Sequence, residues 1–185
     1  GLPKDAHIFF YTCAGNKSKW SLGKTFNQRI AYSTDGGKSI AKLEGSVVKH
    51  ISEENRDPKV YWHEESKAYY MVLYLKANDF MILRSRDLKS WKKTQVLTLD
   101  QASECPDLRE VPVEGGGSRW MFWTADGFYF LGDFDGYEFK SDGVRHEAYL
   151  TGIPYAAQTI WGTEDIITIP WLRTKNKGKM YTGVM

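Results

Sequence analysis

Short apolar runs alternate with glycine-containing turns along most of this chain, and this alternation constrains the fold more than any other feature. Asp35-Gly36-Gly37 and Gly115-Gly116-Gly117 separate such runs, as do the Asp-Gly pairs at 126–127 and 135–136. Glycine readily adopts the positive φ angles that tight hairpins require. No stretch of about a dozen residues spaces its apolar residues at the 3.6-residue period of an amphipathic helix. The sequence therefore predicts an all-β chain.

The predicted strands are runs of alternating or continuous apolar residues that are bounded by turn residues. The strongest helix candidate, around Asp100–Glu104, amounts to a single turn at most. We predict strands at His7–Thr12, Arg29–Ser33, Lys59–His63, Ala68–Leu75, Phe80–Ser85, Thr94–Leu99, Arg119–Thr124, Phe128–Asp133, Tyr155–Ile160 and Ile166–Trp171.

Composition limits the possible classes of function. Lys and Arg number 25 against 23 Asp and Glu, for a net charge of +2, whereas nucleic-acid-binding domains usually carry a strong basic excess. No apolar run approaches the ~20 residues that span a bilayer. A metal site is not expected, because the histidines are scattered along the chain, at His7, His50, His63 and His146. No cofactor is expected either. The aromatic fraction of 15% suits an all-β core and also a carbohydrate-binding surface.

Three aspartates recur after strand-like runs, at a spacing close to the length of a propeller blade. Asp35 and Asp87 each follow a serine that ends a strand-like run, and Asp135 precedes Gly136 in a third such unit. The spacing of about 50 residues is near that of four-stranded blades. The repeat favours a propeller, but a sandwich or a barrel would also contain such turns.

Two short acidic motifs place a carboxylate close to a proline. The first is Arg56-Asp57-Pro58 and the second is Glu104-Cys105-Pro106. Because proline disfavours the helical conformation of the preceding residue, we expect Asp57 and the segment after Glu104 to be extended. Glycoside hydrolysis uses a pair of carboxylates that flank the scissile bond. On residue types alone, a surface Arg56–Asp57 ion pair and a solvated Glu104 are the simpler explanation, because Asp-Pro and Glu-Cys pairs also occur by chance.

The two motifs resemble those of glycoside hydrolase family 32, the β-fructosidases. Arg56-Asp57-Pro58-Lys59-Val60 resembles the family's RDPKV motif, and Glu104-Cys105-Pro106-Asp107-Leu108 resembles its ECPDL motif. Further segments resemble family motifs in the family's order: Gln28–Ser33 with Asp35-Gly36-Gly37, Ser85–Trp91, Gly132–Gly136 and Tyr155–Thr159.

The resemblance implies a fold and a set of residue roles. The fold would be part of a five-bladed β-propeller, roughly blades 2–4, with Asp57 and Glu104 at the ends of inner strands on a common face. Glu104 would be the general acid/base, and Asp57 would stabilise the transition state. Arg56 would be a second sugar contact. Trp171 would line the fructose pocket, although a tryptophan in a strand is often simply a core residue.

The chain departs from the family pattern in one respect that concerns chemistry. The family's nucleophile is the first aspartate of a W-M-N-D-P-N-G motif, and the printed sequence has no such segment. We therefore expect residues 1–185 to form a single partial propeller, with the family's nucleophile segment and its C-terminal β-sandwich both absent. On its own, such a chain is expected to be inactive.

The resemblance implies a retaining glycoside hydrolase that acts on the β-linked fructose of sucrose, levan or inulin. Two alternatives stay open: a non-catalytic fructan-binding or degenerate propeller module, and a fructosyltransferase. The expected partner is a fructose-containing oligo- or polysaccharide, and no nucleic acid or membrane partner is expected. Open propeller edges predict self-association. A polysaccharide substrate favours a secreted or periplasmic location, which the sequence itself leaves unknown.

Overall fold

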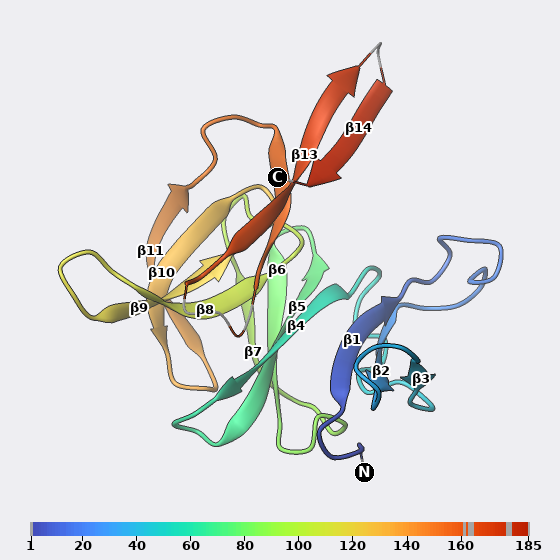
Figure 1. The fold of residues 1–185 in the computed structure, drawn as a ribbon. Helices are drawn as coiled ribbons and strands as arrows, with labels where there is room; N and C mark the ends of the chain where they lie inside the picture. The colour runs from blue at the N-terminus through green and yellow to red at the C-terminus, as the bar shows by residue number, and fades with distance from the viewer. Residues whose placement is uncertain (1, 161, 163–164, 177–178, 185) are drawn as a thin grey trace.

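The computed structural model describes residues 2–160, 162, 165–176 and 179–184, and it confirms the predicted all-β fold (Figure 1). No helix in this described part of the chain has the length and hydropathy needed to cross a membrane. The strands are β1 (His7–Cys13), β2 (Asn27–Ser33), β3 (Ala41–Lys42), β4 (Arg56–His63), β5 (Ala68–Lys76), β6 (Asp79–Ser85), β7 (Lys92–Thr98), β8 (Asp107–Pro112), β9 (Ser118–Trp123), β10 (Phe128–Phe134), β11 (Phe139–Glu147), β12 (Pro154–Thr159), β13 (Thr168–Asn176) and β14 (Lys179–Val184).

The strands form four antiparallel sheets that follow one another along the chain. Their orders are β1-β2-β3, β4-β5-β6-β7, β8-β9-β10-β11 and β12-β13-β14. Every sheet is a meander, because each strand pairs with its neighbour in sequence. Successive four-stranded meanders are the blades of a β-propeller. The chain is therefore part of a propeller, and the two central sheets have the four strands of a blade.

Some strands and the helix candidate differ from the sequence-based expectations. β8 was not predicted, because its buried Leu108 is followed by Arg109 and Glu110 rather than by an apolar run. β11 was not predicted either, because it lies at the edge of its sheet and most of its residues are exposed. Residues 100–104 contain only a turn and a bend, so no helical turn forms there.

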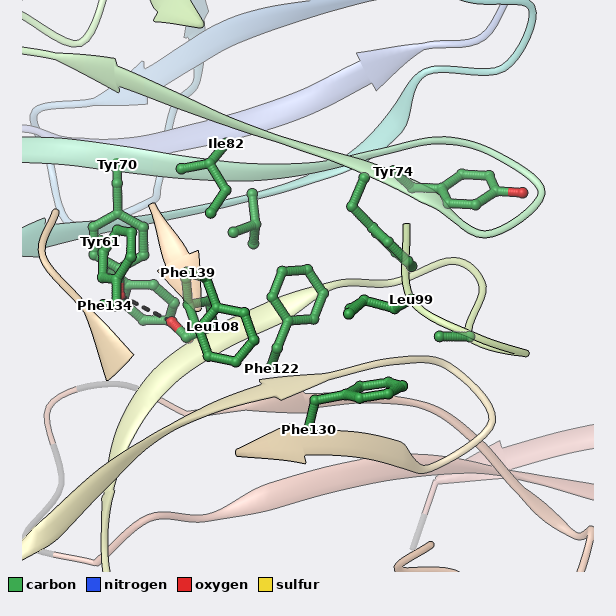
Figure 2. Close-up of a cluster of buried hydrophobic side chains, with 13 residues drawn as sticks. Tyr61, Tyr70, Tyr74, Ile82, Leu99, Leu108, Phe122, Phe130, Phe134 and Phe139 are labelled. Atoms are coloured by element: carbon green, nitrogen blue, oxygen red, sulfur yellow. Dashed lines mark hydrogen bonds between the residues drawn. The ribbon is translucent and has the colours of Figure 1, made fainter. Parts of the chain in front are cut away.

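The largest hydrophobic cluster joins the second and third sheets (Figure 2). Phe80 of β6 and Phe122 of β9 are fully buried, with their ring centroids 5.2 Å apart in an edge-on arrangement. Tyr70 of β5 donates a hydrogen bond of 2.9 Å to the carbonyl oxygen of Leu108 in β8, the dashed line in Figure 2. A second cluster joins the first and second sheets through Phe10, Val48 and residues of β5 and β6. Burial of apolar surface thus fixes three sheets side by side.

The three recurring aspartates occupy the same turn in three successive sheets. Asp35 lies between β2 and β3, Asp87 between β6 and β7, and Asp135 between β10 and β11. Each carboxylate accepts hydrogen bonds from backbone N–H groups two to four residues further on. The repeat in the sequence therefore marks the last hairpin of each of these three sheets, where the aspartate accepts hydrogen bonds from the backbone of the turn.

Candidate active site

The acidic motifs lie at the start of the first strands of two neighbouring sheets. Asp57 is the second residue of β4, and Glu104 lies shortly before β8. Arg56 joins them: its guanidinium forms an ion pair and hydrogen bond with Oε1 of Glu104, and its Nε lies 3.7 Å from Oδ2 of Asp57. The structure therefore brings Arg56, Asp57 and Glu104 together in one cluster.

The backbone at these positions is left-handed, which corrects the expectation of extended segments before the prolines. The φ angle is 60° at Asp57, 55° at Glu104 and 43° at Cys105. In β4, the register shifts between Arg56 and Lys59, so a β-bulge holds Asp57 out of the regular ladder. Non-glycine residues in this region cost about 1–3 kcal/mol each, and such strain is found mainly at functional sites.

Contacts with the sheets on either side explain why Asp57 adopts this conformation. The N–H of Asp57 donates to Oγ1 of Thr12 at 3.2 Å, and Oδ2 of Asp57 accepts a hydrogen bond of 3.2 Å from the N–H of Cys105. The Cys105 thiol lies 3.7 Å from the same oxygen. Burial raises the pKa of Asp57, although the Cys105 N–H and the Arg56 guanidinium act in the opposite direction. Asp57 is thus a partly desolvated carboxylate whose charge is only partly compensated.

Both oxygens of Glu104 have specific partners. Oε1 accepts from Arg56, and Oε2 accepts from the hydroxyl of Tyr155, the second residue of β12. The side chain of Glu104 is 29% exposed, so solvent still reaches it. Burial, followed by the hydrogen bond to Glu104, raises the pKa of Tyr155, so that its hydroxyl stays protonated and able to donate. A carboxylate held on two sides and open on the third can exchange a proton with a bound molecule.

Arg56 is itself held by three groups besides Asp57. Its Nη1 lies 2.6 Å from Oε2 of Glu54, and its guanidinium lies 4.6 Å from the centroid of the Tyr74 ring. Although burial alone would lower it, the hydrogen bonds to Glu54 and Glu104 raise the pKa of Arg56. The guanidinium therefore keeps its charge and fixes the separation of the two carboxylates.

Trp171 lies in the same region, one side chain further from Glu104. It pairs with Tyr155 across β12 and β13, and the two rings are 6.3 Å apart. Its side chain is 50% exposed, so Trp171 is not a core residue. A half-exposed indole next to Tyr155, which itself contacts Glu104, offers an apolar face on which a sugar ring can stack.

The model of the family "Glycosyl hydrolases family 32 N-terminal domain" matches residues 2–183. The chain belongs to glycoside hydrolase family 32. Its relatives in this family include an invertase from Debaryomyces hansenii, which is 36% identical over 82% of this chain and 32% of the relative. A levanase from Bacillus subtilis is 34% identical over 72% of this chain and 23% of the relative. The chain thus spans about a third or less of these curated relatives.

Solved structures agree with this membership. A β-fructofuranosidase from Schwanniomyces occidentalis complexed with fructosyl-erythritol matches with a TM-score of 0.81 and 27% identity, over 96% of this chain and 38% of that one. An exo-inulinase from Aspergillus awamori has the same fold, with a TM-score of 0.75 at 23% identity. The partial propeller described above is therefore the fold of part of a family 32 N-terminal domain.

The family 32 motifs contain a buried network whose geometry was not predicted from the sequence. Asp107 of the second motif is 1% exposed and accepts hydrogen bonds from the hydroxyls of Tyr61 and Thr159, at 2.8 and 2.7 Å, and from the N–H of Thr159 at 3.0 Å. Lys59 of the first motif lies 3.7 Å from Asp107 and donates to Gln158 at 3.1 Å. The network ties β4, β8 and β12 together directly beside the carboxylate cluster. The first strands of these three sheets therefore meet.

Tyr155 is the site residue that the sequence analysis missed. It belongs to the quoted Tyr155–Thr159 segment, but nothing in that segment indicates that its hydroxyl reaches a carboxylate 51 residues away. The register of β12 against β13 shifts between Tyr155 and Gln158, and Ala156 has a φ of 52°. The same device, a left-handed residue near the start of a first strand, thus occurs in a third sheet. The part of the chain that the structure describes contains no cluster of three or more His, Cys, Asp or Glu suited to a metal.

Proposed function

We propose that this chain supplies the acid/base and the transition-state-stabilising carboxylate of a retaining β-fructosidase, acting on the β-linked fructose of sucrose, levan or inulin. The observation that carries the proposal is the Arg56-bridged pair of Asp57 and Glu104 at the starts of β4 and β8. Membership of family 32 supports the same reaction class, since an invertase and a levanase are among the relatives.

Glu104 would act twice in this reaction. It would first donate its proton to the glycosidic oxygen, so that the leaving sugar departs as a neutral alcohol. It would then take a proton from the water that attacks the fructosyl-enzyme intermediate. Arg56 and Tyr155 support this role, because each contacts one oxygen of Glu104 and so fixes the direction of its carboxyl group.

Asp57 would stabilise the positive charge that develops on the fructose ring in the transition state. Its carboxylate is partly desolvated, so its electrostatic attraction to that charge is stronger than it would be in water. Its free oxygen positions would accept hydrogen bonds from fructose hydroxyls. Arg56 would contact the same sugar, and the half-exposed Trp171 would line the pocket.

The retaining reaction also needs a nucleophile, and the resemblance assigns it to a segment that the printed sequence does not contain. We therefore expect residues 1–185 alone to release no fructose. The nucleophile-bearing polypeptide, defined as this chain preceded by the N-terminal part of a family member that includes W-M-N-D-P-N-G, should release it. Fructose release from sucrose, levan and inulin measures the difference. If this polypeptide folds and binds levan without cleaving it, the non-catalytic module is the correct reading.

The decisive variant is Glu104→Gln in the nucleophile-bearing polypeptide. Loss of general acid–base catalysis should lower turnover of sucrose by about 10²–10⁴-fold. A fructoside with an activated leaving group needs little protonation, so its first step should recover and the covalent fructosyl-enzyme should accumulate, as intact-protein mass spectrometry would detect. The exposed Glu44→Gln is the matched control and should turn over normally. Turnover within a few-fold of the parent in Glu104→Gln would disprove the assignment. Product analysis with added acceptor sugar separates hydrolysis from fructosyl transfer.

A further inference from the structure

The β6–β7 hairpin concentrates positive charge on a chain that is otherwise almost neutral. Between residues 84 and 93, the sequence has five cations, Arg84, Arg86, Lys89, Lys92 and Lys93, against the single carboxylate of Asp87. The whole chain carries a net charge of only +2. This excess is local, and it lies outside the proposed active site.

Part of this hairpin forms one wall of a pocket with a volume of about 540 Å³. The pocket lies between the hairpin and the turn that connects β10 and β11 in the next sheet. It is lined by three cationic side chains, Arg84, Arg86 and Lys92, by one carboxylate, Asp87, by hydroxyl groups that include those of Ser90 and Thr94, and by the ring of Tyr137. Tyr137 is 46% exposed, so part of its side chain is accessible to a ligand.

Within the residues that the structure describes, the positive charges of this pocket are not neutralised. The Asp87 carboxylate is occupied by its own turn: it accepts from the N–H groups of Lys89 and Ser90, at 2.9 and 2.7 Å, and from the Ser85 hydroxyl at 3.0 Å. These backbone hydrogen bonds hold the pKa of Asp87 well below its usual value. The exposed side chains of Arg86 and Lys92 have no hydrogen bond or ion pair with any described residue.

Arg84 and Tyr137 give the pocket a fixed wall. Arg84 donates to the carbonyl oxygen of Ser66 at 2.5 Å, and its guanidinium lies 4.0 Å from the centroid of the Tyr137 ring. The cation–π contact holds one face of the ring and leaves the phenol as a platform. The two cations without partners, Arg86 and Lys92, are therefore free to bind a ligand that lies against a rigid surface.

The pocket lies at the opposite end of the second sheet from the carboxylate cluster. Arg56 is in register with Tyr74, and Tyr74 with Phe80, at one end of β4, β5 and β6. Ser85 is in register with Tyr69, and Tyr69 with Trp62, at the other end. A molecule in this pocket would therefore be bound away from the reacting bond.

We propose that this pocket is an auxiliary binding site for an acidic saccharide, one whose ring carries a carboxylate or a sulfate. The anionic group would pair with Arg86 and Lys92, because charge-assisted hydrogen bonds to arginine and lysine are the strongest that such an oxygen can make. The sugar ring would pack on Tyr137, and its hydroxyls would donate to the oxygens of Ser90 and Thr94, whose own hydroxyl protons go to Asp87 and to the carbonyl oxygen of Ile82. The site would attach the protein to an acidic glycan without involving the fructosidase site.

The test is direct binding of defined glycans to the full chain, measured by isothermal titration calorimetry at low ionic strength. The probes are a galacturonate oligosaccharide, which carries carboxylates, and dextran sulfate, which carries sulfates, with unmodified dextran as the neutral counterpart. We expect at least one acidic probe to bind, the neutral dextran not to bind at the same concentration, and the affinity to fall as salt is added. Which acidic probe binds identifies the anionic group.

Variants locate the site. Arg86→Gln combined with Lys92→Gln should weaken binding by at least about tenfold, and Tyr137→Ala by several-fold. The matched control is Lys38→Gln combined with Lys42→Gln, two exposed lysines of the first sheet, and should bind like the parent. Circular dichroism verifies that all variants are folded. The proposal is wrong if neither acidic probe binds, if dextran binds equally, if the double variant binds like the parent, or if a single-stranded oligothymidine binds as tightly as the glycans.

Discussion

Two groups of carboxylates in this molecule lie in contrasting places, one at the starts of first strands and the other in the last hairpins of three sheets. Asp35, Asp87 and Asp135 sit in the hairpins, where backbone N–H groups two to four residues away satisfy them. Asp57 and Glu104 sit at the starts of first strands, where their partners come from other sheets. The hydrogen-bond partners of the carboxylate therefore come from its own turn in the hairpins, and from distant residues at the starts of the first strands.

The pKa values follow this difference. Hydrogen bonds from Ser39 and Ser33 lower the pKa of Asp35 from 3.8 to about 2, and backbone hydrogen bonds from Glu138 lower that of Asp135. Burial raises the pKa of Asp57. A carboxylate saturated by local donors has little capacity left for a ligand, whereas one that is partly desolvated and incompletely paired is available to bind or react. The comparison predicts which carboxylates serve structure and which serve chemistry.

The largest expected effect tests whether a full set of hydrogen-bond partners, rather than burial, separates the structural carboxylates from the chemically active ones. Asp107 is more deeply buried than Asp57, but four groups surround it. Asp107→Leu should reduce the free energy of unfolding by about 3–5 kcal/mol, because it removes the negative charge beside Lys59 and the buried acceptor of the Tyr61 and Thr159 donors. Urea denaturation followed by tryptophan fluorescence measures this. If Asp107→Leu had parental stability but impaired catalysis, a fully hydrogen-bonded carboxylate would serve chemistry, and the division between the two groups would be wrong.

Asp57→Asn should have the next largest effect, on catalysis rather than on folding. In the nucleophile-bearing polypeptide, loss of one electrostatic contact to the transition state should lower kcat/KM by roughly 10²–10³-fold. An activated leaving group should not rescue it, because protonation of that group is not what is lost. Asp87→Asn is the hairpin counterpart and should turn over like the parent. Equal losses in the two variants would contradict the division.

Tyr155→Phe sharpens the comparison at Glu104. The substitution removes one hydrogen bond to the carboxylate and keeps the ring that faces Trp171. Loss of a charge-assisted bond is worth about 1.5 kcal/mol, so kcat in the nucleophile-bearing polypeptide should fall about tenfold. KM should stay within about twofold, since Tyr155 acts through Glu104 as a positioning residue. A change confined to KM would make Tyr155 a sugar contact instead.

Asp87→Ala should affect stability alone, and modestly. It removes the acceptor for two backbone N–H groups in an exposed turn, so a loss of about 1 kcal/mol in unfolding free energy is expected. Thermal or urea unfolding measures the loss, and fructose release by the nucleophile-bearing polypeptide should be unchanged. A catalytic defect here would show that the hairpin carboxylates are not purely structural.

The smallest expected effect is a pair of opposite pH dependences. The lowered pKa of Asp35 stabilises the fold above about pH 4, and this contribution is lost as the pH falls towards about 2, so Asp35→Asn should flatten the acid limb of stability. The raised pKa of Asp57 has the opposite effect on stability. Its stabilisation of the fold is complete below pH 3.8 and is lost as the pH rises through the folded-state pKa. Asp57→Asn should therefore not lower stability at neutral pH. Urea unfolding between about pH 2.5 and 7 tests both.

Much of the fold could be predicted because local sequence determines it. Strands such as β5 and β6 are apolar runs between turns, and the three hairpin aspartates form contacts within four residues of themselves. β11 could not be predicted, because a polar strand at the edge of a sheet needs only the neighbouring ladder of β10 and carries no apolar pattern. Pairing with a neighbour, rather than side-chain pattern, makes it a strand.

The candidate site was predictable in its residue types but not in its geometry. Arg56, Asp57 and Glu104 stand in recognisable motifs, and the structure brings them together. The left-handed backbone at Asp57 and the contact of Tyr155 with Glu104 were not foreseeable, because both depend on partners in other sheets. Tertiary contacts there override the conformational preference that the following proline imposes.

The origin of the cluster in three separate sheets also has a consequence for the time course of folding. The contacts of Glu104 with Arg56 and Tyr155 join residues 48 and 51 positions apart, whereas each sheet is built from neighbouring hairpins. Hairpins close in microseconds, and long-range pairings form more slowly because a longer chain segment must be ordered first. During refolding, sheet content should therefore recover before the carboxylates meet. We therefore expect the surface that carries the carboxylates to be among the last parts of the chain to form.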